Sequence, residues 1–374
     1  MNNLKLISYL ICIISLVLFY SCSSNSKKDI KIGAVLPLTG ELASYGKWTK
    51  DGIDLAVEEI NKTRKANDES LIKILYEDDQ STPNQAVSGL QKLISIENVK
   101  VVIGDLASGF TLNMAPIAEQ KHVILFSPAS SSPLITNAGD YIFRNWPSDI
   151  YESKALANYL LKQNKKRIGI IAVNNDFGVG IDSAFVTYFK AVGGAVAYNE
   201  FVSENKNSYR SEIQKIKNIP VDGMYIIGYA TDVAKTIKAI KEALINVSLF
   251  STSSAENQIL INMLGKNANG LVYTAPSYDA NSSDSLVKQF VMNFKNKYNY
   301  LPPLNAATGY DAVRILIYAI NNVGYNANLI KDFLVHVKDF PGVSGKTTFD
   351  NNGDVAKPII LKIIKNDMFE MLKN

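Results

Sequence analysis

Cysteine and histidine are nearly absent from this chain, which removes several kinds of chemistry. Its 374 residues include two cysteines and two histidines, His122 and His336. Both cysteines, Cys12 and Cys22, lie near the N-terminus, so the rest of the chain can form no disulfide. A zinc site needs three or four convergent ligands, which two histidines without a cysteine do not supply. We therefore expect no metal ion and no other cofactor, and a stability that comes from a buried core.

An excess of charge of one sign is also lacking. Lysine and arginine number 39 against 35 aspartates and glutamates, for a formal net charge of +4. This balance is too small and too evenly spread to indicate a nucleic-acid partner. Hydrophobic residues make up 47% of the chain, as in an ordinary globular protein. The length is sufficient for two domains with full cores.

Long apolar runs are absent except for one near the N-terminus. Residues 6–20 are almost all apolar, but roughly 15 residues are too few to span a bilayer and indicate an export signal. Cys22 follows a small residue, Ser21, and precedes a polar stretch. This arrangement resembles a bacterial lipoprotein signal, in which the thiol is lipidated and becomes the first mature residue. We predict a signal peptide at 1–21, a tether at 22–29 and a lipid anchor to the membrane on Cys22.

An ordinary membrane anchor with an incidental cysteine is the alternative interpretation. Phe19 and Tyr20 stand where lipoprotein signals prefer leucine and a small residue, and Lys5 is the only basic residue before the apolar run. Either interpretation predicts an exported, tethered protein in the periplasm or at the cell surface.

Strand and helix patterns alternate after the N-terminal segment. Ile30–Leu36 is a short β-rich run that ends at a proline, and buried strands follow at 71–76, 99–104 and 123–126. The segments between them carry apolar residues three and four positions apart, the spacing of helices with one buried face. This order predicts a parallel sheet covered by helices on both faces.

The same rhythm restarts in the middle of the chain. Arg167–Val173 repeats the pattern of the first strand, and further strands are predicted at 195–202, 224–228, 249–252 and 271–274. We interpret this second series as a second doubly wound lobe.

The remaining segments connect and complete the two lobes. Residues 143–148 form the predicted first crossing, which is too short and too bulky for a free linker. Helices near 287–298 and 304–323 complete one lobe, and 358–364 is a final strand. The predicted fold class is therefore α/β, with two doubly wound parallel-sheet lobes.

Motifs that would indicate an enzyme fail on their spacing. A segment near the C-terminus imitates a phosphate-binding loop, but Gly342 and Gly345 enclose two residues where that loop needs four. Phe177–Gly180 follows a strand yet lacks the third glycine of a dinucleotide-binding fingerprint. Asp78 and Asp79 stand before a helix, where carboxylates cap backbone amides. The nucleophile elbow of hydrolases does not occur, so we expect no catalysis.

Small and hydroxyl-bearing residues cluster where two predicted strands of the first lobe end. The segment 107–109 follows one strand, and the serine-rich segment 127–132 follows the next. Ligands of open parallel sheets lie outside these strand ends, where small residues let amides approach and helix N-termini favour an anion. One such loop alone would be an ordinary surface loop, but two in matching positions predict a carboxylate cradle. Phe177, Tyr229 and Ser253 stand at the corresponding strand ends of the second lobe.

Several segments in a fixed order carry a family resemblance. They are Ile32–Gly40, Ser44–Gly46, Glu77–Asp79, Val102–Gly104, Phe126–Pro133, Phe143–Asp149 and Gly309–Val313. Together they resemble the solute-binding proteins of ABC importers, of the branched-chain amino-acid type, which have the type I periplasmic-binding fold. The likeness extends from about Ile30 to about Asn366.

This resemblance implies two lobes joined by three crossings. The crossings would lie near Trp146, Ser277 and Gly345, which would place the imitation phosphate loop in a glycine-rich crossing strand. The implied division of the chain is residues 30–146 and 278–345 for lobe 1, and residues 147–277 and 346–374 for lobe 2.

The resemblance also implies roles for residues of the two serine-containing loops. Ser108 matches a serine that holds the α-carboxylate of the ligand. Ala129 and Ser131 match positions that contribute carbonyl, amide and hydroxyl groups to the α-ammonium and the carboxylate. Ala107 and Ser130 belong to the same loops and complete the candidate set on this lobe.

The second lobe and the cleft mouth supply the other candidates. Tyr45 matches a tyrosine that closes over the ligand, and Tyr229 matches one that covers it from the second lobe, although both could be surface aromatics. Ser253 stands where an acidic residue of the family pairs with the α-ammonium, and Phe177 stands where the family has a tyrosine. A buried ammonium without a carboxylate is costly, so Glu256 would have to substitute, or the ligand lacks an amine. Carboxylates, amides and aromatic acids therefore stay open as ligands beside amino acids.

We expect a monomeric, lipid-anchored receptor that captures a small solute between its lobes and delivers it to ABC permease subunits. A receptor of a signalling system is the alternative, since the two share a fold; the chain ends without a transmembrane or kinase segment, which favours transport. An enzyme on this scaffold would need a nucleophile–base pair that the sequence does not offer.

Overall fold

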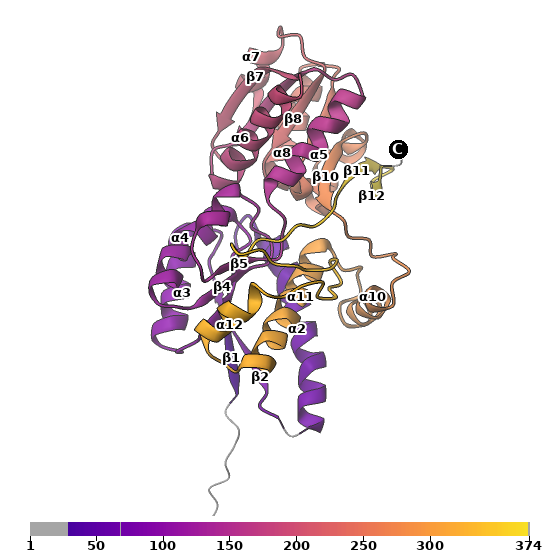
Figure 1. Ribbon diagram of the computed structural model, residues 1–374. Helices are drawn as coiled ribbons and strands as arrows, with labels where there is room; N and C mark the ends of the chain where they lie inside the picture. Colours follow the sequence, from indigo (N-terminus) through magenta and orange to yellow (C-terminus); the bar gives the residue numbers. More distant parts are fainter. Residues whose placement is uncertain (1–28, 68, 373–374) are drawn as a thin grey trace, which may run out of the picture.

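The structure, a computed structural model, describes residues 29–67 and 69–372. The predicted signal peptide, most of the tether and the lipid anchor on Cys22 lie outside the described residues. Two α/β bodies lie one above the other, each built around its own sheet (Figure 1). Lobe 1 denotes the body with the five-stranded sheet, and lobe 2 the body with the seven-stranded sheet. Within the described residues, no helix combines the length and apolarity that crossing a membrane requires.

Lobe 1 is a parallel sheet covered by helices on both faces. Its strand order is β2-β1-β3-β4-β5, and each neighbouring pair is parallel. The inner strands are apolar and buried, as the sequence pattern predicts, whereas the edge strand β2 is mostly half-buried. Its elements are β1 (Ile30–Leu36), α2 (Ala43–Ala66), β2 (Ile72–Asp78), α3 (Pro83–Ser95), β3 (Val101–Ile103), α4 (Ser108–Gln120), β4 (Ile124–Ser127), β5 (Ile142–Arg144), α10 (Ser285–Tyr298), α11 (Leu304–Val323) and α12 (Ala327–Leu334), with a 3₁₀ turn at Pro133–Asn137.

The late helices return to lobe 1 because α2 and α11 pack closely. A Cβ atom at Gly52 would lie 2.0 Å from the backbone oxygen of Ala306, so the contact requires glycine. Residues of α10, α11 and α12 share one hydrophobic core with β1, β3 and β4. The prediction that the helices near 287–298 and 304–323 complete one lobe is confirmed.

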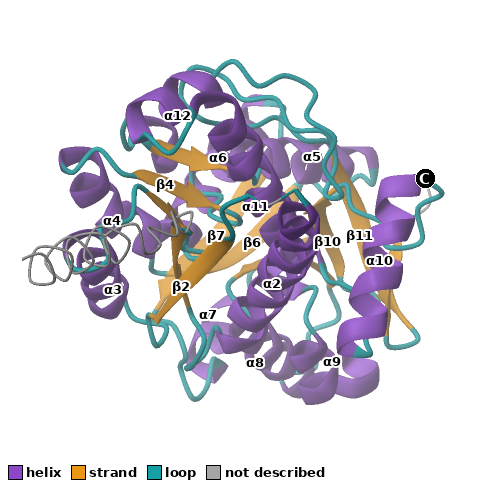
Figure 2. Ribbon diagram, turned by 90° about the horizontal axis from the view of Figure 1, so that it is seen from below, coloured by secondary structure: helices purple, strands orange, loops and turns teal. Residues whose placement is uncertain are grey.

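Lobe 2 repeats the parallel arrangement and adds an antiparallel edge. Its strand order is β12-β11-β10-β9-β8-β6-β7, in which β11 is antiparallel to both of its neighbours. Figure 2 shows helices on both sides of the strands. The elements are α5 (Asp149–Lys162), β6 (Arg167–Val173), α6 (Asp176–Ala191), β7 (Ala195–Val202), α7 (Arg210–Ile216), β8 (Gly223–Ile227), α8 (Ala230–Glu242), β9 (Ser248–Ser251), α9 (Gln258–Leu264), β10 (Val272–Pro276), β11 (Ile359–Lys365) and β12 (Met368–Met371), with 3₁₀ turns at Ser253–Ala255 and Gly265–Ala268. The predicted fold class is confirmed.

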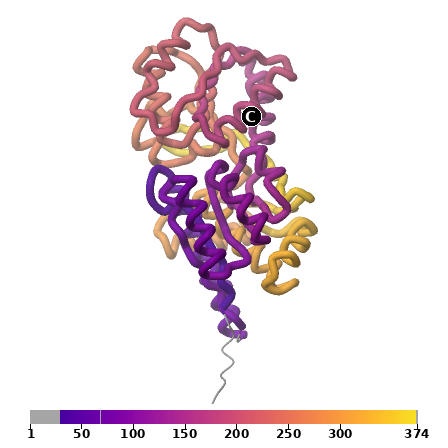
Figure 3. The backbone as a smooth tube through the Cα atoms, turned by 90° about the vertical axis from the view of Figure 1, so that its left-hand side faces the viewer, coloured from indigo at the N-terminus to yellow at the C-terminus, as the bar shows by residue number. Residues whose placement is uncertain are grey.

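The last crossing between the lobes lies later than predicted. The sequence assigned residues 346–374 to lobe 2, but Phe349 packs edge-on against Phe126 and Phe143 in the core of lobe 1. Val355 belongs to the same core. The segment then passes between the lobes (Figures 1 and 3) and joins lobe 2 as β11. The boundary after residue 345 is therefore too early, because contacts distant in sequence hold the next residues in lobe 1.

The imitation phosphate loop is tied to a carboxylate of the chain itself. Asp311 accepts hydrogen bonds from the amides of Val343, at 2.9 Å, and Ser344, at 2.8 Å. A Cβ at Gly342 would lie 2.6 Å from an Asp311 carboxylate oxygen, which explains the glycine. The loop amides thus anchor the late segment to α11, in agreement with the rejection of a phosphate site.

Candidate functional site

A cavity lies between the lobes at the ends of both sheets. We name it the inner cavity because it includes Trp146 at the first crossing. The space between its walls, including the part open to solvent, is about 560 Å³. The residues that line it are Leu42, Tyr45, Leu106, Ala107, Ser108, Ala129, Ser131, Trp146, Phe177, Tyr229, Ser253, Ser254 and Asn305.

The lobe 1 wall of the inner cavity presents a hydroxyl whose hydrogen bonds leave a donor free. Ser108 is the first residue of α4, so it lies at the positive end of the helix dipole. Its Oγ accepts hydrogen bonds from the amides of Ser131, at 3.2 Å, and Ser132, at 3.1 Å. Because both acceptor positions of the hydroxyl are used, its proton is available to donate. This wall therefore suits a carboxylate.

A network behind this wall fixes the serine-rich loop. The backbone oxygen of Asp105 accepts from the hydroxyl of Ser127, at 2.6 Å, and from that of Ser130, at 3.1 Å. Ser130 also lies 2.7 Å from the hydroxyl of Thr111. The Ser130 side chain is fully buried in this network and does not line the cavity. We expected Ser130 among the binding residues, but its side chain lies in the hydrogen-bond network behind the cavity wall.

Arg144 fixes the end of the same loop. Its guanidinium is fully buried and donates to the backbone oxygen of Ser132, at 2.8 Å. It also forms a two-point ion pair with Asp354, with both N–O distances 2.7 Å. The pair joins β5 to the late segment of lobe 1, so the loop position depends on residues far apart in sequence.

The lobe 2 wall combines two aromatic rings with the serines Ser253 and Ser254. Phe177 and Tyr229 stack with ring centroids 5.5 Å apart and an interplanar angle of 26°. Phe177 lies in the first turn of α6, and Tyr229 immediately precedes α8. Ser253 stands beside them and donates its hydroxyl to Oε1 of Glu152, at 3.2 Å. This wall therefore offers an apolar surface next to serine hydroxyls.

Tyr45 joins the two lobes directly. Its hydroxyl donates to the backbone oxygen of Ser254, at 2.7 Å, and accepts from the amide of Ala230, at 3.2 Å. Burial raises the pKa of Tyr45 to about 12, so the phenol stays neutral and can donate. Ser44, one residue earlier, accepts from the side chain of Asn257 at 2.9 Å. The structure is therefore a closed arrangement held by contacts from α2 to lobe 2.

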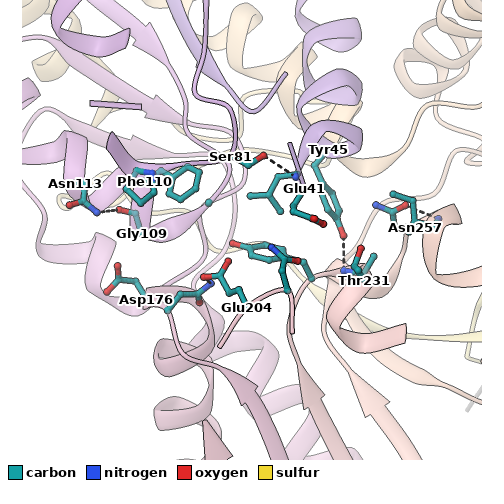
Figure 4. Close-up of a pocket in the computed structure, with 18 residues that line it drawn as sticks. Glu41, Tyr45, Ser81, Gly109, Phe110, Asn113, Asp176, Glu204, Thr231 and Asn257 are labelled. Atoms are coloured by element: carbon teal, nitrogen blue, oxygen red, sulfur yellow. Dashed lines mark hydrogen bonds between the residues drawn. The ribbon is translucent and has the colours of Figure 1, made fainter. Parts of the chain in front are cut away.

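A second cavity, which we name the outer cavity, adjoins the first beyond Tyr45 and Tyr229. Its volume, including open solvent, is about 720 Å³. Figure 4 shows Tyr45 reaching toward the Thr231 loop, with Asp176 and Glu204 on the lobe 2 side and Glu41 on the lobe 1 side. The four residues shared by both cavities are Leu42, Tyr45, Ala107 and Tyr229.

The structure brings most of the predicted site residues together and leaves Glu256 out. Tyr45, Ala107, Ser108, Ala129, Ser131, Phe177, Tyr229 and Ser253 line the inner cavity. Glu256 instead accepts from Lys362 and from the hydroxyl of Tyr273, the latter at 3.0 Å. The proposal that Glu256 replaces the missing acidic residue therefore lacks geometric support.

Two buried carboxyl groups lie behind the lobe 2 wall, and sequence reasoning did not single them out. Asp149 and Glu152 occupy the first turn of α5, and each is 1% exposed. Burial raises the pKa of Glu152 to about 7, against the hydrogen bonds from Thr274 and Ser253. Burial and then the charge of Glu152 raise the pKa of Asp149. The local signal is that of ordinary helix-capping acids, so only the fold reveals their position.

Other lining residues had no sequence signal of their own. Leu42 and Ser254 neighbour predicted residues along the chain, and could have been found from them. Leu106 lies in the loop between β3 and α4, two residues before Ser108. Asn305 comes from α11, which no motif connects with the cleft.

Comparisons with known proteins agree with this geometry. The family model described as periplasmic binding protein matches residues 29–366. The Leu/Ile/Val-binding protein BraC3 of Rhizobium johnstonii is 27% identical over 332 residues, which cover 88% of this chain and 89% of that protein. The leucine-binding protein LivK of Thermotoga maritima has a TM-score of 0.87 at 27% identity, covering 92% of this chain and 98% of that one.

A second solved structure contains a bound amino acid. The branched-chain amino-acid transporter substrate-binding protein LivJ of Streptococcus pneumoniae, in complex with isoleucine, has a TM-score of 0.84 at 26% identity. The match covers 93% of this chain and 100% of that one. From the extent of the family match, this chain belongs to the periplasmic binding protein family.

Proposed function

We propose that this protein is the extracytoplasmic receptor of an ABC importer and captures an amino acid in the inner cavity. The observation that carries the proposal is a cavity between two lobes with a donor hydroxyl on one wall, stacked aromatic rings on the other and Tyr45 bridging them. A solute of amino-acid size would contact both walls at once. Its binding energy would therefore favour the closed arrangement over an open one.

Lobe 1 and lobe 2 have different tasks in this proposal. The Ser108 hydroxyl and the N-terminus of α4 bind the solute carboxylate, and the loop network holds them in place before the solute arrives. Phe177 and Tyr229 then cover the apolar part of the solute on closure. No bond of the solute is made or broken. The permease would recognise the closed form.

A binding screen tests this function. The protein from Ser23 onward is heated with each of the twenty amino acids and with amides and carboxylic acids of similar size. A bound solute raises the melting temperature by mass action. The Ser108→Ala, Tyr229→Ala double variant should bind the strongest hit about tenfold more weakly or worse. The proposed function fails if no solute shifts the melting temperature, or if the double variant keeps its calorimetric affinity.

The lipid anchor on Cys22 and delivery to a permease are finer parts of the same proposal. Cys22→Ser should release the protein from the membrane fraction of expressing cells, and mass spectrometry of the wild type should show a lipidated N-terminal cysteine. A wild-type protein that stays unmodified would contradict the anchor. Solute uptake in vesicles with the matching permease, with and without the receptor, would test delivery.

A further inference from the structure

Glu152 is a buried carboxyl group in contact with a residue of the cleft. Its Oε1 accepts from the Ser253 hydroxyl at 3.2 Å, and its Oε2 accepts from the Thr274 hydroxyl at 2.7 Å. Ser253 lines the inner cavity, whereas Glu152 and Thr274 lie behind it. The hydroxyls of Ser253 and Thr274 are both neutral, and no ion pair of Glu152 occurs within the described residues. The carboxylate therefore approaches the cleft without a positive charge to balance it.

Its neighbours do not supply that balance. Asp149, on the same turn, is buried, and neither of its carboxylate oxygens has a hydrogen-bond partner within the described residues. Arg144, the cation that acts on Asp149, is held in the ion pair with Asp354. On β8, burial and then the charges of Glu152, Asp149 and Asp182 raise the pKa of Tyr225, so this phenol adds no positive charge.

The cation of the adjacent strand is also engaged elsewhere. Lys362 on β11 pairs with Glu256. A buried negative charge without a cation is unfavourable, and the entry of a positive group lowers this free-energy cost. Within the described residues, the lobe 2 side of the cleft thus carries a buried carboxylate that no ion pair balances.

The two walls of the cleft offer different hydrogen-bonding groups, an acceptor on lobe 2 and a donor on lobe 1. A serine hydroxyl has one proton, and Ser253 donates its proton to the ionised Glu152. On the side that lines the cavity, Ser253 Oγ can then only accept a hydrogen bond. On the opposite wall Ser108 accepts two amide hydrogens and is left to donate. A molecule that offers a carboxylate to one wall and an N–H cation to the other matches both.

We propose that Glu152, acting through Ser253, supplies the negative charge that holds an ammonium group of the solute, so that the cleft selects amino acids over carboxylic acids without an amine. This inference rests on the proposed function of the inner cavity. Glu152 is a positioning residue, since Ser253 makes the contact.

Two matched probes separate charge recognition from general binding. L-Leucine and 4-methylpentanoate differ only in the ammonium group. If another of the twenty amino acids gives the largest melting shift, that amino acid and its analogue without the amine replace them. The wild type should bind the amino acid at least about tenfold more tightly than the analogue, as expected for hydrogen bonds that involve a charged group.

The Glu152→Gln variant should remove this preference alone. Its affinity for the amino acid should fall by about tenfold or more, and its affinity for the analogue should stay within about twofold. The wild-type affinity for the amino acid should rise between pH 5.5 and 8.5, because Glu152 must be ionised, while the variant should show no such rise. A purely structural role would weaken both probes together and would leave the pH profile unchanged.

Two further variants serve as controls. Glu256→Gln removes a carboxylate that is near in sequence but paired with Lys362, and should leave both affinities within about twofold. The double variant Glu152→Gln, Ser253→Glu returns a carboxylate to the cleft itself and should recover amino-acid binding to within about threefold of wild type. Recovery supports the inference even if Glu152→Gln alone lowers the melting temperature.

Three outcomes overturn the inference. One is a Glu152→Gln variant that binds the amino acid as the wild type does, and another is equal weakening of both probes without recovery in the double variant. The third is a wild type that binds an amine-free carboxylate and none of the twenty amino acids. In that third case the proposed capture of a solute stands and only the ammonium site fails, whereas no binding of any solute removes both.

Discussion

The two walls of the inner cavity are built in opposite ways. Lobe 1 presents small residues and hydroxyls whose positions are fixed by buried hydrogen bonds to the Asp105 backbone and by Arg144. Lobe 2 presents two stacked aromatic rings, Phe177 and Tyr229, with two serines beside them. In the proposed function, lobe 1 would hold the polar end of the solute before closure, and lobe 2 would cover its apolar part afterwards.

The buried acidic residues behind the two walls also differ in what they contact. In lobe 1, Asp79 and Asp105 lie close together, and burial raises the pKa of each. Asp105 uses one carboxylate oxygen for the amide of Ala107, at 2.8 Å, so this pair supports the loop itself. In lobe 2, Glu152 reaches the cleft through the Ser253 hydroxyl. The lobe 1 pair thus supports a loop, whereas Glu152 of lobe 2 contacts a residue that lines the cavity.

The largest effect should come from removing the cation that fixes the lobe 1 wall. Arg144→Leu leaves Asp354 without its partner and frees the Ser132 carbonyl, so we expect unfolding to become easier by about 3–5 kcal/mol. Urea denaturation measures this change. Arg210→Leu is the matched control, because the Arg210–Glu242 pair is exposed and should contribute less than about 1 kcal/mol. Similar losses in the two variants would contradict the fixed-wall description.

The buried acid of lobe 2 should make the empty protein less stable as the pH rises. Burial raises the folded pKa of Glu152 to about 7, above its value in an unfolded chain. The folded state therefore holds an extra proton between pH ~4.5 and ~7, and stability falls across this window by up to about 3 kcal/mol. Glu152→Gln should flatten that part of the profile, measured by denaturation at several pH values. A profile as steep as that of the wild type would place the titration on the lobe 1 acids instead.

Local sequence patterns were enough to predict most strands of both lobes, although not the short strands β5 and β12. The helix predicted near 304–323 is α11, Leu304–Val323, because its apolar spacing is regular along its whole length. The boundary of the last crossing was wrong because Phe349 is placed by Phe126 and Phe143, more than two hundred residues earlier in the chain. The earlier boundary was implied by the family resemblance, and a contact of that kind gives no signal in the local sequence that could correct it.

The same distinction applies to the site. The strand-end loops could be predicted because topology alone brings the ends of parallel strands together. Ser130 was included through its neighbours, but its side chain turns into the support network while that of Ser131 lines the cavity. Glu152 could not be predicted, since its link to Ser253 joins residues 101 positions apart and its sequence context is that of a helix cap.

Neighbouring serines offer a finer test of the lobe 1 wall. Ser108→Ala removes the donor that faces the cavity, so solute affinity should fall by about tenfold, measured by calorimetry. Ser130→Ala is the control: it removes a hydroxyl from the network behind the wall, and should lower stability by about 1 kcal/mol while affinity stays within about twofold. If Ser130→Ala weakens binding as much as Ser108→Ala does, the separation between lining and support is wrong.

The smallest effect should come from the hydroxyl that holds the two lobes together. Tyr45→Phe keeps the ring but loses the bonds to Ser254 and Ala230, which together contribute about 1 kcal/mol to closure. Solute affinity should fall roughly fivefold, because part of the binding energy must now close the lobes. Small-angle scattering should show a larger radius of gyration for the empty variant and the wild-type value at saturating solute. The exposed Tyr151→Phe is the control, and an unchanged affinity in Tyr45→Phe would mean that the solute alone holds the lobes closed.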